Sequence, residues 1–72
     1  MFRFRFVAKW SNKEGVFIVR RRTKGGRARR GIFAVGTTRK GVKLNVTRAI
    51  EDLFKECKVP RGRKFTSSVV YR

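Results

Sequence analysis

Apolar and charged residues alternate strictly at the start of the chain. In FRFRFVAKW (2–10), one set of alternate positions is aromatic or small, and the other set is mainly basic. Successive side chains of a β-strand point to opposite faces, so this period of two predicts a half-buried strand. The aromatic face comprises Phe2, Phe4, Phe6, Ala8 and Trp10, and the other face comprises Arg3, Arg5, Val7 and Lys9.

A second and a third strand flank the most basic stretch of the chain. SNKEG (11–15) has the composition of a turn, and GVFIVRRR (15–22) is rich in the β-branched and aromatic residues that favour strands. RARRGIFAV (27–35) predicts a returning strand, and TKGG (23–26) supplies glycines for the positive φ of a tight turn. The stretch RRRTKGGRARR (20–30) therefore predicts the distal end of a β-hairpin.

Apolar residues spaced by three and four predict one helix within residues 46–58. The stripe consists of Val46, Ala49, Ile50, Leu53, Phe54 and Cys57. Asn45 or Thr47 offers an N-cap oxygen, and Pro60 prevents the helix from continuing. Before the helix, GTTRKG (36–41) has loop composition and VKLNV (42–46) alternates like a short fourth strand. After it, FTSSVVY (65–71) predicts a last strand.

Together these elements predict one small α+β domain over residues 1–72. We expect an antiparallel sheet of three to five strands, in the order strand, strand, strand, optional strand, helix, strand. The amphipathic helix should pack on one face of the sheet, and an Arg-rich β-hairpin should protrude. A row of Phe side chains also suits base stacking. We favour a core role for Phe2, Phe4 and Phe6, because the helix stripe needs an apolar partner.

The charge of the chain is strongly positive. The chain has 21 Lys and Arg against 4 Asp and Glu, a formal net charge of +17. Such a chain repels itself, and binding of a polyanion, usually a nucleic acid, relieves that repulsion. Arg outnumbers Lys by 13 to 8, and the guanidinium fork matches phosphate oxygens.

The charge is unevenly distributed along the chain. Residues 46–58 hold three basic and three acidic side chains, whereas the rest of the chain carries the whole net charge. A helix that reads a DNA groove needs cationic side chains, so this helix should back the sheet instead. The phosphate contacts are then expected from strands and loops. The candidate nucleic-acid-binding residues are Arg3, Arg5, Lys9, Arg20, Arg21, Arg22, Lys24, Arg27, Arg29, Arg30, Arg39, Lys40, Lys43, Arg61, Arg63 and Lys64.

Three partners remain open. A two-stranded ribbon fits the major groove of B-form DNA, which slightly favours double-stranded DNA and a role as recombination accessory, regulator, or nucleoid or viral DNA binder. Structured RNA is the alternative, as for a ribosomal protein that binds rRNA, since basic hairpins suit RNA shape and phosphates equally well. A basic inhibitor of an acidic protein surface is the third.

A sheet followed by a helix resembles the small DNA-binding domains at the start of some tyrosine recombinases. The resemblance covers VFIVRRRTKGGRARRGIFAVG (16–36) and TRAIEDLF (47–54), without a diagnostic motif. This chain departs from that pattern by adding a last strand and by containing no catalytic domain. The resemblance implies DNA binding.

Residue types needed for most catalysis are missing. The chain has no His and one Cys, which rules out the usual zinc spacing and an internal disulfide. We therefore expect no enzyme activity, metal, cofactor or small-molecule substrate.

Apolar runs reach only four residues, and the N-terminus lacks the apolar core of a signal peptide, so we expect no membrane association. An intracellular location (cytoplasm, nucleoid or ribosome) follows as an expectation.

Overall fold

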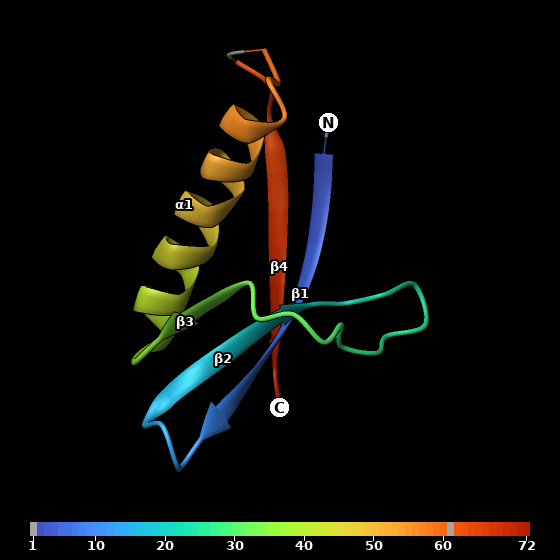
Figure 1. Ribbon diagram of the computed structural model, residues 1–72. Coiled ribbons are helices and arrows are strands. Elements are labelled where there is room, and N and C mark those ends of the chain that lie inside the picture. Colours follow the sequence, from blue (N-terminus) through green and yellow to red (C-terminus); the bar gives the residue numbers. More distant parts are fainter. Residues whose placement is uncertain (1, 61) are drawn as a thin grey trace.

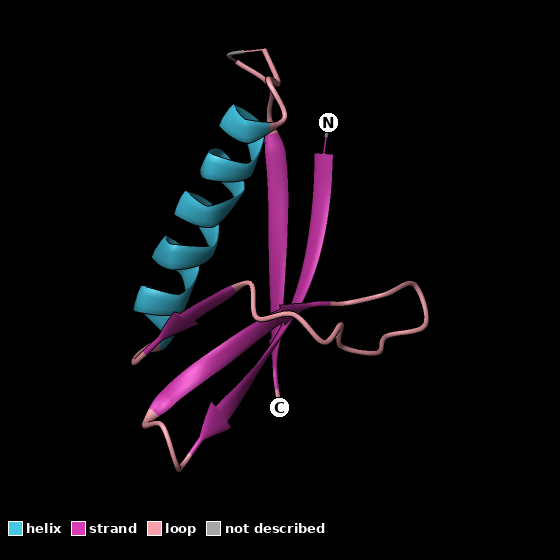
Figure 2. Ribbon diagram, viewed as in Figure 1, coloured by secondary structure: helices cyan, strands magenta, loops and turns pink. Residues whose placement is uncertain are grey.

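The computed structural model describes residues 2–60 and 62–72. Its elements follow in the order β1 (Phe2–Ser11), β2 (Val16–Arg21), β3 (Ala34–Gly36), α1 (Arg39–Glu56) and β4 (Phe65–Tyr71) (Figure 1). The four strands form one sheet in the order β3-β2-β1-β4, and α1 lies between β3 and β4 in the chain (Figure 2). The α+β prediction is confirmed.

The sheet is mixed, and not wholly antiparallel as the sequence pattern suggested. β1 pairs antiparallel with β2 from Phe6↔Arg21 to Ser11↔Val16, and β2 pairs antiparallel with β3. β4 pairs parallel with β1, from Phe2↔Phe65 to Ala8↔Tyr71. Parallel neighbours need a long crossover connection, and α1 lies within this one as the chain passes from one edge of the sheet to the other.

The core forms between the aromatic face of β1 and one stripe of α1, as expected. Its buried residues are Phe4, Phe6, Ala8, Val19, Val42, Val46 and Ile50. Phe2 lies at the margin, where its ring centroid is 5.0 Å from that of Phe54. The Phe row therefore serves as core, and its basic opposite face points away from the helix.

The helix begins seven residues earlier than the sequence predicted. Thr38 is the N-cap, and its Oγ1 accepts a hydrogen bond from the Gly41 amide at 3.0 Å. The predicted fourth strand (42–46) is therefore wrong, because Val42 is buried in the first turns of α1 while Leu44 is half exposed. Asn45 is not a cap; its Nδ2 donates to the Val35 carbonyl at 2.7 Å and ties α1 to β3.

Two further predictions need correction. The third strand was expected over residues 27–35, but β3 spans only Ala34–Gly36, because the preceding residues form an irregular protruding loop. Cys57 was expected on the buried stripe, yet its side chain is exposed, because α1 ends at Glu56 and Cys57 is the C-cap.

Candidate nucleic-acid interface

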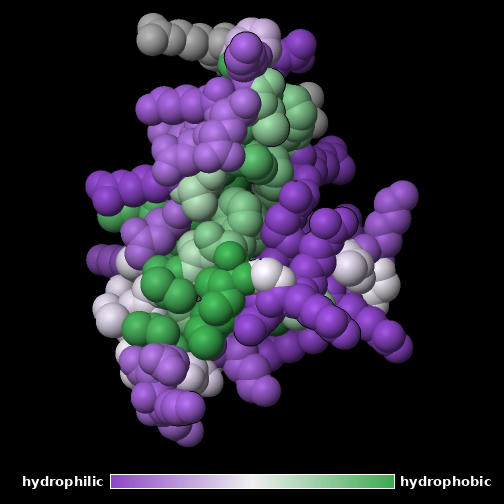
Figure 3. All heavy atoms as spheres, in the orientation of Figure 1, coloured by the Kyte–Doolittle hydropathy of each residue, from purple (hydrophilic) through white to green (hydrophobic). Residues whose placement is uncertain are grey.

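The sheet has one face covered by α1 and one face that α1 leaves uncovered, here called the open face. The registers place Arg3, Arg5, Val7 and Lys9 of β1 on the open face, in line with Ile18 and Arg20 of β2 and with Thr66, Ser68 and Val70 of β4. Arg3, Arg5 and Lys9 are exposed. In the space-filling view, hydrophobic residues form a band along the junction of helix and sheet, and hydrophilic residues gather over the protruding loop (Figure 3).

The protruding loop (residues 22–33, here called the hairpin) is ordered by its own hydrogen bonds. The Thr23 amide donates to the Arg27 carbonyl at 2.8 Å, and the Arg29 amide donates to the Arg21 carbonyl at 2.8 Å. Gly26 has φ of 82°, a value that glycine adopts without steric cost. The hairpin projects on the side of the molecule away from α1 (Figure 1). A protruding basic hairpin was predicted, although its arms pair less regularly than strands do.

The arginines at the end of β2 and those on the returning side of the hairpin differ in their surroundings. Arg27, Arg29 and Arg30 are exposed, whereas Arg20, Arg21 and Arg22 are each half buried. Arg21 lies opposite Phe6 in the register, and its guanidinium carbon is 5.5 Å from the centroid of the Phe4 ring. The cations on the returning side of the hairpin are therefore accessible to a ligand. Those on the outgoing side pack against the end of the sheet.

A basic hollow of about 520 Å³ lies where the hairpin leaves the sheet. It is lined by Arg3, Arg5, Arg21, Arg22, Thr23 and Lys24. Five of these six side chains are cationic, and no acidic side chain lines the hollow. The fold thus brings together candidate residues from β1, β2 and the hairpin.

The middle of the open face is apolar, although this face of β1 was predicted to be mainly basic. Val7 is only 6% exposed, and it shares a hollow with Ile18, Arg20 and the hairpin residue Ala28. The hairpin therefore folds partly over the open face. The signal was present, since Val7 is the one apolar residue in the basic set of alternate positions. Arg72, also missed, lines the same hollow beside Lys9.

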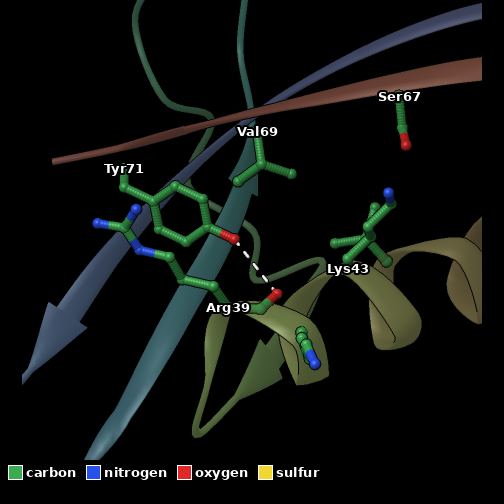
Figure 4. A pocket seen from close by; sticks show the side chains of 7 residues that line it. Arg39, Lys43, Ser67, Val69 and Tyr71 are labelled. Carbon is green, nitrogen blue, oxygen red and sulfur yellow. Dashed lines mark hydrogen bonds between the residues drawn. The ribbon is translucent and has the colours of Figure 1, made fainter.

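Three candidates that were expected in a loop or a strand belong to the helix instead. Arg39, Lys40 and Lys43 occupy the first turns of α1, so the helix carries five basic and three acidic residues and a net charge of +2. They line a groove of about 380 Å³ between α1 and β4, with Tyr71 on the opposite wall (Figure 4). Tyr71 donates to the Arg39 carbonyl at 3.4 Å, and its ring centroid is 4.6 Å from the Arg39 guanidinium carbon. These cations lie on the helix-covered side, apart from the open face.

The loop between α1 and β4 contributes a third basic region. Arg63 and Lys64 are exposed, and the Lys64 carbonyl accepts a hydrogen bond from the Phe2 amide at 3.2 Å, which places them beside the start of β1. Arg61, also a candidate, lies outside the described residues.

In the part of the chain that the structure describes, no acidic residue lines the hollows at the open face and the hairpin, whereas Glu51 lines a hollow with Arg63 of the loop between α1 and β4. Glu14 lies in the turn between β1 and β2, and Glu51, Asp52 and Glu56 lie on α1. Among the described residues, no three His, Cys, Asp or Glu side chains gather as a metal site would require. Within residues 2–60 and 62–72, no helix has the length and apolarity to cross a bilayer.

Comparison of the chain with protein-family models, with curated proteins and with solved structures finds no match.

Proposed function

We propose that this chain is a non-catalytic nucleic-acid-binding protein that holds the phosphate backbone of double-stranded DNA through its open face and its hairpin. The observation that carries the proposal is the separation of charge in space. Cations from β1, β2 and the hairpin converge on surfaces that no acidic residue shares, while the apolar face is covered by α1. Such a surface is stable only when a polyanion or its counterions neutralise it.

The shape of the hairpin favours DNA over RNA. It projects from the sheet as a loop (Figure 2), whose two sides meet in an antiparallel bridge between Arg22 and Ala28. Arg27, Arg29 and Arg30 of this loop are exposed. The major groove of B-form DNA is about 12 Å wide and admits a two-stranded ribbon, whereas the major groove of A-form RNA is too narrow for side chains to read. A recombination accessory, a regulator, or a nucleoid or viral DNA binder would use this geometry inside the cell.

The direct test is fluorescence anisotropy with three probes of equal length: duplex DNA, duplex RNA and single-stranded DNA. We expect the tightest binding to duplex DNA, with log K falling linearly with log salt at a slope that reflects about six to ten phosphate contacts. Preference for duplex RNA would reassign the protein to a ribonucleoprotein, such as the ribosome. Absence of binding to all three probes would refute the proposal and direct attention to an acidic protein partner.

A pair of matched variants locates the contacts. The hairpin variant R27Q/R29Q/R30Q and the control variant K13Q/R48Q/K55Q each remove three exposed cations. We expect the hairpin variant to lower the salt slope by about two to three, since each lost phosphate contact lowers it by about 0.9. The control variant should retain most of the slope. Equal losses in both variants would mean that only total charge matters.

A further inference from the structure

The basic hollow lies where β1 extends beyond the end of β2. The register of β1 with β2 begins at Phe6, while β1 continues along β4 back to Phe2. One more hydrogen bond, from the Arg22 amide to the Arg5 carbonyl at 2.9 Å, joins the departing hairpin to β1. The hairpin then turns aside, so that Arg3 and Arg5 face its basic outgoing side across the hollow.

Arg22 has a donor that the protein leaves unused. Its Nε is closed off from solvent and has no hydrogen-bond partner among the residues that the structure describes. A buried donor without a partner is costly, and most such donors in folded proteins are paired. A small rotation of the guanidinium toward the hollow would present Nε to an incoming oxyanion, which would remove that cost.

The walls of the hollow are positioned before any ligand arrives. The turn is closed by hydrogen bonds from Thr23 to Arg27 and from Gly26 to Thr23, at 2.8 and 2.9 Å. Gly26 lies beside the Arg22 guanidinium, since a Cβ built at that position would be in ordinary contact with Nη2, at 3.5 Å. Arg21 lines the hollow from the helix-covered side, where its guanidinium carbon lies 5.5 Å from the centroid of the Phe4 ring. Ordered cations lose less entropy on binding than free ones do.

We propose that this hollow is a preformed oxyanion site that takes one phosphate group of a nucleic-acid strand, with Arg22 as its central donor. The proposal rests on the nucleic-acid function proposed above, and names the point where the backbone is anchored. Guanidinium groups bind phosphate oxygens through paired N–H donors, and the Thr23 hydroxyl adds a neutral donor to the walls. A volume of about 520 Å³ is also in the range that holds ligands larger than a bare phosphate, so the attached sugar can enter.

The first experiment uses inorganic phosphate as the probe and the full chain labelled with ¹⁵N. Phosphate is titrated at constant ionic strength, balanced with chloride, while the Nε–H cross-peaks of the arginine side chains are followed by NMR. We expect the Arg22 cross-peak to shift and saturate, while that of Arg48, an exposed residue of α1, does not. A uniform, non-saturating drift of all arginine peaks would overturn the proposal.

The second experiment compares two variants that keep the net charge. Arg22→Lys removes the guanidinium fork from the hollow, and Arg48→Lys makes the same change on α1. We expect R22K to weaken binding to duplex DNA by about tenfold or more and R48K to leave it unchanged, because an ammonium group keeps the charge but cannot form the paired hydrogen bonds that a guanidinium makes with a phosphate. Arg5→Lys provides a second test on an exposed side chain of the hollow, should R22K lose its native circular dichroism spectrum. Equal affinities for R5K, R22K and R48K would refute the site.

The failures of the two proposals can be told apart. Saturable phosphate binding at Arg22 without duplex binding would refute the nucleic-acid function and keep the oxyanion site. Tight duplex binding that R22K and R5K leave unchanged would refute the site and keep the function. Duplexes with and without a 5′-phosphate identify the source of the ligand: equal affinity assigns the site to an internal diester, and a dependence on the 5′-phosphate assigns it to a terminal monoester.

Discussion

Gly36 lies where β3 packs closely against the first turn of α1. It is buried, and a Cβ at this position would lie 2.7 Å from the Val42 amide nitrogen and 2.9 Å from Val42 Cγ2. Since the first of these atoms belongs to the helix backbone, a rotamer change cannot make room. The absence of a side chain at Gly36 therefore lets the first turn of α1 settle onto the sheet.

Gly36→Ala should destabilise the protein by about 1–3 kcal/mol, the usual cost of inserting a methyl group into a packed site. Chemical denaturation of the variant measures this loss. Gly31→Ala is the matched control, because a Cβ there meets nothing within 4 Å, and its effect should stay within about 0.5 kcal/mol. Similar stabilities of the two variants would show that α1 can shift away from β3 without cost.

The helix combines a structural role with an electrostatic conflict. Its buried stripe (Val42, Val46 and Ile50) anchors it on the sheet, and Thr38 caps its start. Its first turn, however, carries basic residues and no acidic one, at the end where the helix dipole is positive. A helix optimised for stability alone would place acidic residues there, so the cations are retained at a cost in stability. We propose that this end of α1 gives the nucleic acid a second contact, on the helix-covered side and apart from the open face and the hairpin.

Lys40→Glu should therefore change stability and binding in opposite directions. The free protein should gain about 0.3–1 kcal/mol over a Lys13→Glu control, which reverses the same charge in the turn between β1 and β2. Duplex binding should become weaker in K40E than in K13E. Chemical denaturation at low salt and anisotropy measure the two quantities. A gain in stability without a loss of affinity would separate this end of the helix from the nucleic-acid interface.

The whole molecule is a folded chain with a large excess of one charge. A net charge of +17 on 72 residues creates repulsion within the folded state, which salt screens over a Debye length of about 10 Å at 0.1 M. The same salt weakens phosphate contacts by lowering the gain from counterion release. Stability and affinity must therefore respond to salt with opposite signs.

We expect the Tm of the free protein to rise between about 50 mM and about 500 mM sodium chloride, while affinity for duplex DNA falls over the same range. Thermal melts followed by circular dichroism, paired with anisotropy on the same samples, provide the check. A Tm that falls with salt would indicate that attraction between charges, and not repulsion, dominates the folded state.

The bounds of the two strands with a clear sequence pattern of their own were predicted well. The strand expected over residues 65–71 is β4, and the one expected over 2–10 is β1 with one more residue. The start of α1 was missed, because Val42, Leu44 and Val46 fit a strand by their period of two, while Val42 and Val46 also fit a helix. Burial of Val42 against the sheet, capping by Thr38 and the close approach at Gly36 favour the helix.

Alternation in the sequence was sufficient to predict an apolar face and a mainly basic face of β1, because each strand sorts its own side chains and buried charge is too costly to keep. The polyanion partner stays a prediction. The tertiary structure decided which cations lie close together, because they come from distant parts of the chain. The departure of the hairpin from β2 brings Arg21 and Arg22 to Arg3 and Arg5, whereas the early start of α1 carries Arg39 to the other side. Crossovers and loop directions are set by packing of the whole chain, so neither arrangement was visible in local spacing.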